Sequence, residues 1–259
     1  MQIIKEKRTI AALQREAVLY IGLPKDYYQS DQAYPVLYMH DGQNVFFEED
    51  AFINKTWRVK EAFEDNDDLP DMIIVALSSA MGEARLDEYG PFPFDQEVLA
   101  EFNLDSSGGG GKRYIDYLVH ELKPEIDKTY RTLQDARHTA IMGASMGGVI
   151  SLYAGLKYPE VFALIASLSG SYFVSMPAFI KTIKQADIAS LVKVYLDTGD
   201  AEVAGGDEED YVMSNLAIFE ALKEKLSNQQ LEFQVISEGK HTEVDWAKRF
   251  PKIIRTLFK

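Results

Sequence analysis

The chain has 259 residues, of which 46% are hydrophobic and 26% are charged, and its formal net charge is −14. This size and composition suit one large soluble domain over residues 1–259 with a sizeable core. The acidic balance argues against nucleic acid and anionic membranes as partners. The sequence has no cysteine, which excludes disulfides, thiol catalysis and cysteine-ligated metals.

The amino-terminal residues 1–10 do not show a basic segment followed by an apolar core, so we expect no signal peptide. No run of about 18 apolar residues appears anywhere in the chain, so we expect no membrane span. Together with the lack of cysteine, these features favour a cytoplasmic protein.

The first third of the chain is rich in residues that favour strands. Residues 9–24 alternate and end at Pro24, and compact apolar runs cover 35–40 and 72–79. Short apolar runs without polar alternation are typical of strands that are buried on both faces.

Residues 81–111 form a long stretch in which Pro, Gly and aromatic residues are mixed without a clean period. The stretch is too long for an ordinary loop of a packed domain. We therefore expect a lid-like excursion over the top of the fold, and we expect this part to set substrate specificity.

From residue 112 onward, strand patterns and helix patterns alternate. Such alternation predicts an α/β fold with a mostly parallel central sheet that helices cover on both faces. Ligands of such sheets bind outside the carboxyl ends of the strands. The predicted helices cover 112–130, 146–158, 178–186, 211–226 and 243–258, and the predicted strands cover 138–145, 161–171, 191–200 and 231–239.

A G-x-S-x-G pattern, Gly143 to Gly147, lies between a predicted strand and a predicted helix. In that context the pattern indicates a nucleophile elbow, in which a strained turn lifts the hydroxyl of Ser145 above the sheet edge. The N–H group of Met146, at the start of the helix, is then a candidate oxyanion donor. The alternative is that the glycines serve helix packing and the serine is incidental.

A serine hydroxyl needs a base, and only one of the four histidines follows Ser145 in the chain. His241 comes after the last predicted strand, at the carboxyl end of the sheet, and is our candidate base. His120 and His138 are expected to have structural or surface roles. His40 ends a predicted strand near the site, where we expect it to shape a turn.

The acid that orients the histidine is expected after the strand at 191–200, where three carboxylates compete. Asp197 is still within the strand and ranks last. Asp200 and Glu202 both lie past Gly199, where the chain can turn toward the histidine, and we prefer Glu202 with Asp200 as the alternative. The later acidic run, Gly206–Asp210, is expected to be a solvated face at a helix start.

These segments together resemble the putative esterase family of the α/β-hydrolase superfamily, which includes esterase D, feruloyl esterase and enterochelin esterase relatives. The resemblance rests above all on the block 117–173, and also on PVLYMHDGQNVF, RLDEYGPF, YLDTGDAE and GKHTEVDW. It implies an α/β-hydrolase fold and a serine hydrolase with Ser145 as nucleophile, His241 as base and Glu202 as acid. It also implies a second oxyanion donor in the backbone of Gly42 or Gln43.

The expected reaction is hydrolysis of a small soluble carboxylic ester through an acyl-enzyme, with no metal and no cofactor. An acyltransferase with the same triad is the alternative, and a catalytically silent binding protein on the same fold is a third possibility. The relatives also raise the prospect of a homo-oligomer. The aromatic residues expected to line the substrate pocket are Trp57, Tyr89, Phe92 and Tyr172.

Overall fold

The structure is a computed structural model, and it describes residues 1–203 and 208–258. The first two residues of the acidic run Gly206–Asp210 therefore lie outside the described part of the chain. The strands are β1 (Gln2–Ile10), β2 (Arg15–Leu23), β3 (Val36–Met39), β4 (Ile73–Leu77), β5 (Thr139–Ala144), β6 (Leu164–Leu168), β7 (Lys193–Gly199) and β8 (Leu231–Ile236). The helices are α1 (Val59–Asp65), α2 (Glu83–Tyr89), α3 (Gln96–Glu101), α4 (Gly111–Tyr117), α5 (Lys123–Thr129), α6 (Met146–Lys157), α7 (Met176–Gln185), α8 (Glu208–Lys223) and α9 (Glu243–Leu257).

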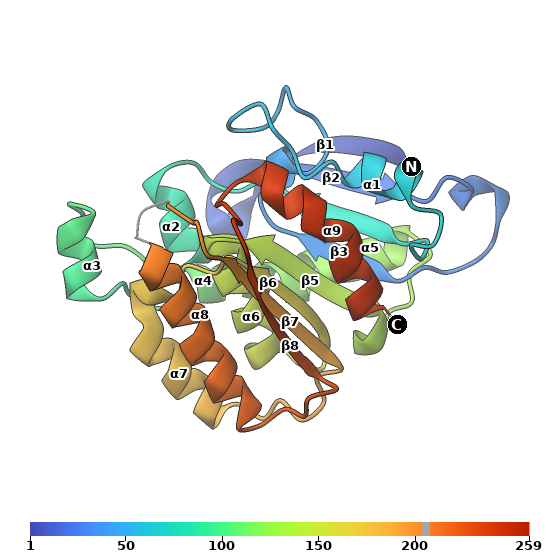
Figure 1. Cartoon of the computed structure of the whole chain (residues 1–259). Helices are drawn as coiled ribbons and strands as arrows, with labels where there is room; N and C mark the ends of the chain where they lie inside the picture. Colours follow the sequence, from blue (N-terminus) through green and yellow to red (C-terminus); the bar gives the residue numbers. More distant parts are fainter. Residues whose placement is uncertain (204–207, 259) are drawn as a thin grey trace.

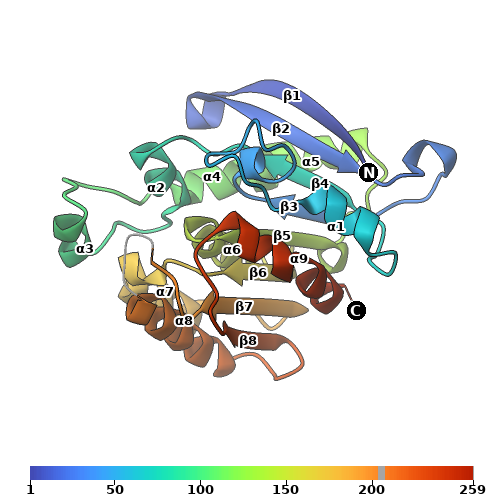
Figure 2. The ribbon, with the colours of Figure 1, turned by 45° about the horizontal axis from the view of Figure 1, so that its top comes forward.

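The strands form one mixed sheet in the order β1-β2-β4-β3-β5-β6-β7-β8, which Figure 2 shows from β1 at the top to β8 at the bottom. Neighbours from β4 through β8 pair in parallel, whereas β1 pairs antiparallel with β2 and β2 pairs antiparallel with β4. The predicted mostly parallel sheet is confirmed. Its parallel part brings the carboxyl ends of β3 to β8 to one edge, where the candidate residues follow.

Both faces of the sheet are covered by helices, as the sequence pattern predicts (Figure 1). In β3, Val36 and Tyr38 belong to the core on the side of α4 to α8. Leu37 and Met39 alternate with them and belong to the core on the side of α1 and α9. Because successive side chains of a strand point to opposite faces, one short apolar strand serves two cores.

The amino-terminal strand region differs from its prediction over residues 9–24. A single 3-10 turn, Ala11–Leu13, and a left-handed Gln14 with φ 54° divide the region into β1 and β2. The first strand begins at Gln2, so the hairpin starts earlier than the pattern indicates. No Gly or Pro marks this turn, so the sequence carries no turn signal there.

The excursion 81–111 contains two short helices, α2 and α3, which the sequence pattern did not predict. Figures 1 and 2 both show α3 well away from the sheet, while α2 lies close to it.

The predicted helix at 112–130 is present, but it consists of α4, a π-helical turn over Leu118–Leu122, and α5. The π-turn ends two residues before Pro124, whose missing N–H group disturbs the regular ladder. Helix α1 was also not predicted.

Candidate active site

The candidate residues follow different strands at the carboxyl edge of the parallel sheet. Ser145 comes directly after β5, Glu202 follows β7 and His241 follows β8. Asp41 follows β3, and Arg85 lies on α2, which follows β4. Residues separated by up to 200 positions in the chain are thereby brought to one edge, where ligands of α/β sheets bind.

The turn at Ser145 requires small neighbours. Ser145 has φ 59° and ψ −127°, a backbone conformation that side chains rarely adopt. A Cβ atom added to Gly143 would lie 2.6 Å from the carbonyl oxygen of Gly147, and one added to Gly148 would lie 2.7 Å from Oγ of Ser167. Gly143 therefore allows the tight turn, and Gly148 allows α6 to approach β6. Gly147 is less constrained, because its added Cβ would meet nothing closer than 3.4 Å.

Glu202 is fully buried, and both of its carboxylate oxygens are engaged. Oε2 lies 3.0 Å from Nδ1 of His241. Oε1 accepts hydrogen bonds from the backbone N–H of Gly199 at 2.6 Å and from the hydroxyl of Ser169 at 2.5 Å. These bonds fix the carboxylate and, through it, the direction of the imidazole ring.

The imidazole of His241 is also held by two aromatic rings. The ring of Tyr211 lies 4.8 Å from it, and the ring of Trp246 lies 4.9 Å from it in an edge-on arrangement. His241 lines the cavity, and its Nδ1 faces the carboxylate of Glu202. Nε2 is therefore the ring nitrogen that remains for a reaction in the cavity.

The competing carboxylates lie elsewhere. Asp200 accepts a hydrogen bond from the N–H of Glu238 at 2.6 Å, which braces the chain after β8. Asp197 is buried and binds the hydroxyl of Tyr195 and Nη1 of Arg249, each at 3.0 Å. Of the three acids weighed from the sequence, Glu202 is the one that contacts the histidine.

The hydroxyl of Ser145 lies in hydrogen-bonding distance of another serine, with 3.1 Å between Oγ and Oγ of Ser171. Ser171 in turn lies 3.3 Å from the hydroxyl of Tyr211. Ser145 and His241 line one cavity of about 400 Å³. The other residues that line it are His40, Asp41, Asn44, Phe52, Ile53, Trp57, Gly82, Arg85, Ala144, Glu243 and Trp246.

The predicted oxyanion donors, Met146 and the pair Gly42 and Gln43, lie in different surroundings. Met146 is the first residue of α6, so its N–H group has no intrahelical acceptor and lies beside Ser145. Gly42 and Gln43 lie in a short 3-10 turn and do not line the cavity. Gly42 packs against the end of β4, and the Gln43 amide binds back to Ser79. Their neighbours Asp41 and Asn44 line the cavity, so the backbone of Gly42 or Gln43 as second oxyanion donor stays a prediction.

Sequence analysis missed a charged pair in the cavity. Arg85 binds Asp41 through two parallel hydrogen bonds, Nε to Oδ1 and Nη2 to Oδ2, each 2.7 Å long. Burial would raise the pKa of Asp41, but the ion pair with Arg85 outweighs it and holds this pKa below its usual value. The hydroxyl of Tyr89 accepts the N–H of Asp41 at 3.0 Å, and the Arg85 guanidinium lies over the Tyr89 ring. Nη1 of Arg85 has no hydrogen-bond partner in the described part of the chain.

His40 has the structural role that the sequence analysis expected near this turn. It is buried, its Nδ1 lies 2.9 Å from the hydroxyl of Tyr114, and its ring packs on Tyr89. Burial lowers its pKa to about 3, so the ring is neutral at ordinary pH. His120 is exposed, and His138 is half-exposed and paired with Asp135.

Comparisons with known proteins agree with this geometry. The model of the family described as "Putative esterase" matches residues 10–257. The chain belongs to this family. Membership makes it an esterase, an enzyme that hydrolyses carboxylic esters, and the resemblance stated from the sequence is confirmed.

Individual relatives agree with this assignment. The esterase is 27% identical over 251 residues to an uncharacterized Bacillus subtilis protein, YbbA, covering 94% of this chain and 92% of that one. A ferulic acid esterase structure superposes with a TM-score of 0.71 at 20% identity, covering 98% of both chains. The enterobactin esterase FES from Shigella flexneri, solved in the presence of enterobactin, superposes with a TM-score of 0.77 at 18% identity, and the esterase spans 59% of its length. These structures confirm the α/β-hydrolase fold.

One of the four predicted pocket aromatics lines the cavity of the esterase. Trp57 is buried there and stacks on Trp246, with ring centroids 5.8 Å apart. Tyr89 is buried behind the cavity, where its hydroxyl supports the turn at Asp41. The prediction of Tyr89 as a wall residue is therefore wrong, since α2 directs it into the core.

Phe92 and Tyr172 also lie away from the cavity. Phe92 packs edge-on against Tyr153 and Phe179, between α6 and α7. Tyr172 is fully buried, and its hydroxyl lies 2.7 Å from Oγ of Ser167 beneath α6. Both predictions are wrong for the same reason: these rings fill the core under the elbow helix.

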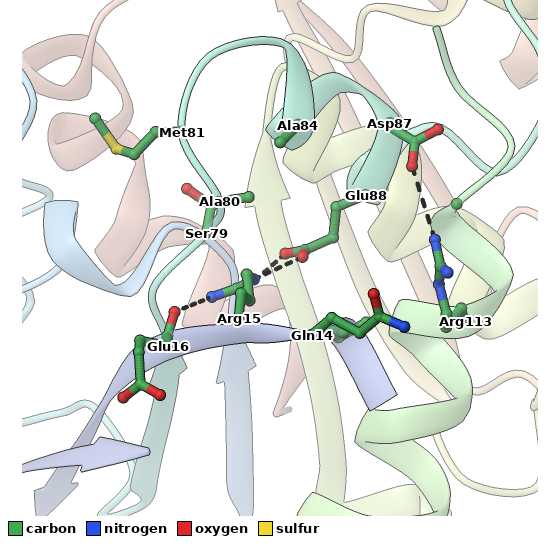
Figure 3. A pocket seen from close by; sticks show the side chains of 12 residues that line it. Gln14, Arg15, Glu16, Ser79, Ala80, Met81, Ala84, Asp87, Glu88 and Arg113 are labelled. Atoms are coloured by element: carbon green, nitrogen blue, oxygen red, sulfur yellow. Dashed lines mark hydrogen bonds and ion pairs between the residues drawn. The ribbon is translucent and has the colours of Figure 1, made fainter. Parts of the chain in front are cut away.

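A second pocket, of about 420 Å³, opens between β2 and α2 (Figure 3). Figure 3 shows the guanidinium of Arg15 bound to the carboxylate of Glu88, through contacts of 2.7 Å and 2.6 Å. Ser145 and His241 do not line this pocket, so it is separate from the candidate active site.

Two further searches covered only the described residues, 1–203 and 208–258. Within these ranges, no group of three or more His, Cys, Asp or Glu side chains is arranged to hold a metal ion. Within the same ranges, no helix is both long and apolar enough to cross a membrane.

Proposed function

We propose that the esterase cleaves a small soluble ester through an acyl-enzyme on Ser145, with His241 as general base and Glu202 as the acid that orients it. The observation that carries the proposal is the 3.0 Å contact between Nδ1 of His241 and Oε2 of Glu202, beside a cavity that also exposes the strained Ser145. A cavity of about 400 Å³ suits a small molecule.

The first step is acylation. The hydroxyl of Ser145 leaves its contact with Ser171, attacks the ester carbonyl and gives its proton to Nε2 of His241. Glu202 accepts the Nδ1–H of His241, which selects the right tautomer and stabilises the positive ring that forms. The protonated histidine then donates its proton to the departing alcohol.

Charge on the carbonyl oxygen develops beside two donors. The N–H group of Met146 has no acceptor within α6 and lies at the positive end of this helix, and preorganised donors of this kind stabilise an oxyanion. Arg85 adds a positively charged donor, because Nε and Nη2 are anchored on Asp41 while Nη1 has no hydrogen-bond partner among the described residues. We assign Arg85 the role that the sequence analysis gave to Gly42 or Gln43.

Deacylation repeats the same chemistry with water. His241 removes a proton from a water molecule, the hydroxide attacks the acyl carbon, and the proton returns to Oγ of Ser145. No step requires a metal or a cofactor.

A fluorophosphonate probe tests the nucleophile and its base. We expect the wild-type protein to be labelled and to hydrolyse short chromogenic esters, whereas Ser145→Ala and His241→Ala lose both properties. His138→Ala, which lies outside the cavity, is the matched control and should be labelled like the wild type. Labelling that persists in folded Ser145→Ala would refute the proposal. Supplying an alcohol and analysing the products distinguishes hydrolysis from acyl transfer.

A further inference from the structure

One carboxylate in the cavity has no place in the proposed reaction. Glu243, the first residue of α9, lines the cavity and is half-buried. Asp41 and Arg85, which also line the cavity, form an ion pair and together add no net charge to it. No ion pair in the described part of the chain includes Glu243, so Asp41, Arg85 and Glu243 together leave the cavity with a net charge of −1. Burial raises the pKa of Glu243 above its usual value, and the nearby charge of Asp41 adds to this effect, whereas His241 and Arg85 act in the opposite direction.

The carboxylate is held in place by Asn44. The Asn44 side chain donates through Nδ2 to Oε1 of Glu243 at 3.0 Å and accepts the N–H of Phe52 at Oδ1 at 3.1 Å. The backbone N–H can only donate, so the amide orientation is fixed and Nδ2 must face the carboxylate. The carbonyl of Asn44 also accepts the N–H of Trp57 at 2.8 Å. One residue thus organises Glu243, Phe52 and Trp57 around a common space.

The rest of that space is aromatic. Trp57 and Trp246 stack with an interplanar angle of 28°, and both line the cavity. Phe52, which is 41% exposed, also lines it and lies nearer the solvent. A carboxylate that shares a cavity with aromatic rings is a combination that binds organic cations, through charge attraction and through the negative faces of the rings.

We propose that Glu243, Trp57, Trp246 and Phe52 form a subsite for a cationic group of the ester, of the size of a trialkylammonium. This inference rests on the proposed ester hydrolysis at Ser145, since it names the substrate class of that same cavity. The competing explanation is that Glu243 only complements the amino-terminal end of α9, where acidic side chains are common.

An isosteric substrate pair tests the charge alone. Acetylcholine and 3,3-dimethylbutyl acetate differ only by nitrogen in place of carbon, and the phenyl esters of betaine and of 3,3-dimethylbutanoic acid differ in the same way on the acyl side. We expect the wild type to have about tenfold higher kcat/KM for the cationic member of one pair, after correction for alkaline hydrolysis rates, as one charge interaction predicts. The pair that shows the preference identifies the side of the ester that the subsite binds.

Glu243→Gln tests the residue, since it keeps the shape and removes the charge. We expect the cationic-to-neutral ratio of kcat/KM to fall about tenfold, to near one. Asp245→Asn is the matched control, because Asp245 lies two residues further along α9, binds Lys248 and does not line the cavity. It removes the same unit of net charge and should leave the ratio unchanged. An equal ratio in wild type and Glu243→Gln, or a wild type without preference, would overturn the proposal.

A binding measurement tests the cation subsite independently of ester hydrolysis at Ser145. The sequence contains two tryptophans, Trp57 and Trp246, and both line this cavity, so intrinsic fluorescence reports on it directly. In Ser145→Ala, choline should change the fluorescence at lower concentration than 3,3-dimethylbutanol, and adding Glu243→Gln should abolish the difference. If the proposed nucleophile is wrong, labelling and hydrolysis fail while this difference persists. If the subsite is wrong, the enzyme is labelled and active but choline and its neutral analogue act alike.

Discussion

Two carboxylates on one loop, Asp200 and Glu202, end in different surroundings. The side chain of Asp200 is exposed and turned back to the N–H of Glu238, whereas that of Glu202 is buried against His241. A carboxylate that orients a histidine must be held itself, and Gly199 and Ser169 hold Glu202 from the opposite side. The structural difference between the two acids is therefore measurable as a difference in catalysis.

We expect Glu202→Gln to lower kcat by at least about 100-fold with little change in KM, because the amide cannot stabilise the protonated imidazole. Asp200→Asn should stay within about threefold of the wild type, because its partner is a backbone N–H remote from the histidine. Steady-state kinetics on a chromogenic ester measures both. A larger loss for Asp200→Asn than for Glu202→Gln would assign the acid to Asp200.

The guanidinium group of Arg85 belongs to a residue that lines the same cavity as Ser145. If it stabilises the oxyanion, Arg85→Met should lower kcat by about 100-fold or more while KM changes less. Arg85→Lys should recover part of the loss, because lysine keeps the charge but cannot form both bonds to Asp41.

Arg15→Met is the matched control for this prediction. It breaks another two-bond ion pair, with Glu88, in the neighbouring pocket of Figure 3 that Ser145 does not line. Thermal unfolding measures what each variant costs in stability. If both variants lose activity in proportion to stability, Arg85 has only a structural role.

The sequence could single out Ser145 and His241 as candidates but not Arg85. The serine carries a local motif and the histidine is the only one downstream, so order along the chain was enough. Arg85 is 44 positions from Asp41, and its bonds to that residue follow from how α2 packs, which no local pattern records. The same reason explains why Tyr89, Phe92 and Tyr172 were assigned to the pocket: aromatic composition does not indicate the direction of a side chain.

At the scale of elements, the sequence predicted the helices and strands that have a sustained hydrophobic period. It did not predict features that depend on one short turn. The βα units after β5 have clear periods, and all were found. The hairpin at Gln14 lacks the usual Gly or Pro, the π-turn at Leu118–Leu122 interrupts an otherwise regular helical period, and helix α1 is only seven residues long. The elbow helix α6 is the element whose packing most directly positions the site, and it depends on Gly148.

Gly148→Ala tests the close approach of α6 to β6. The new Cβ would lie 2.7 Å from Oγ of Ser167, which is bonded to Tyr172 and cannot turn away freely, and 3.1 Å from the carbonyl of Leu168. We expect a loss of about 1–3 kcal/mol of stability from overpacking. At this chain length the melting temperature should fall by about 2–4 °C for each kcal/mol, which calorimetry can measure.

Gly147→Ala, one position earlier on α6, is the control for this substitution. Its added Cβ would meet only ordinary contacts of 3.4 Å, and alanine favours a helix over glycine by up to about 1 kcal/mol. Its melting temperature should equal or exceed that of the wild type. Equal losses for both variants would mean that the close approach at Ser167 is not the cause.

At the scale of the whole molecule, the central strands separate the two cores. Every residue of β3 is buried, and so is His40, which directly follows this strand. The ring stays neutral in the folded state because burial lowers its pKa from 6.5 to about 3. Unfolding exposes the ring, so the unfolded chain takes up a proton below pH 6.5 while the folded chain does not. The contribution of His40 to stability is therefore fully present above pH 6.5 and is lost progressively as the pH falls toward 3.

The low pKa of His40 predicts how much the free energy of unfolding falls on acidification. Between pH 6.5 and pH 5, His40 should account for a loss of about 2 kcal/mol in the free energy of unfolding, at 1.36 kcal/mol per pH unit. Urea denaturation at the two pH values measures it, and His40→Asn, which keeps a polar group beside Tyr114, should reduce the acid-induced loss by about that amount. His120→Asn is the control, because His120 is exposed and should leave the loss unchanged. If His40→Asn retains the full loss on acidification, the ring is not held neutral by burial and the acid sensitivity arises from the carboxylates.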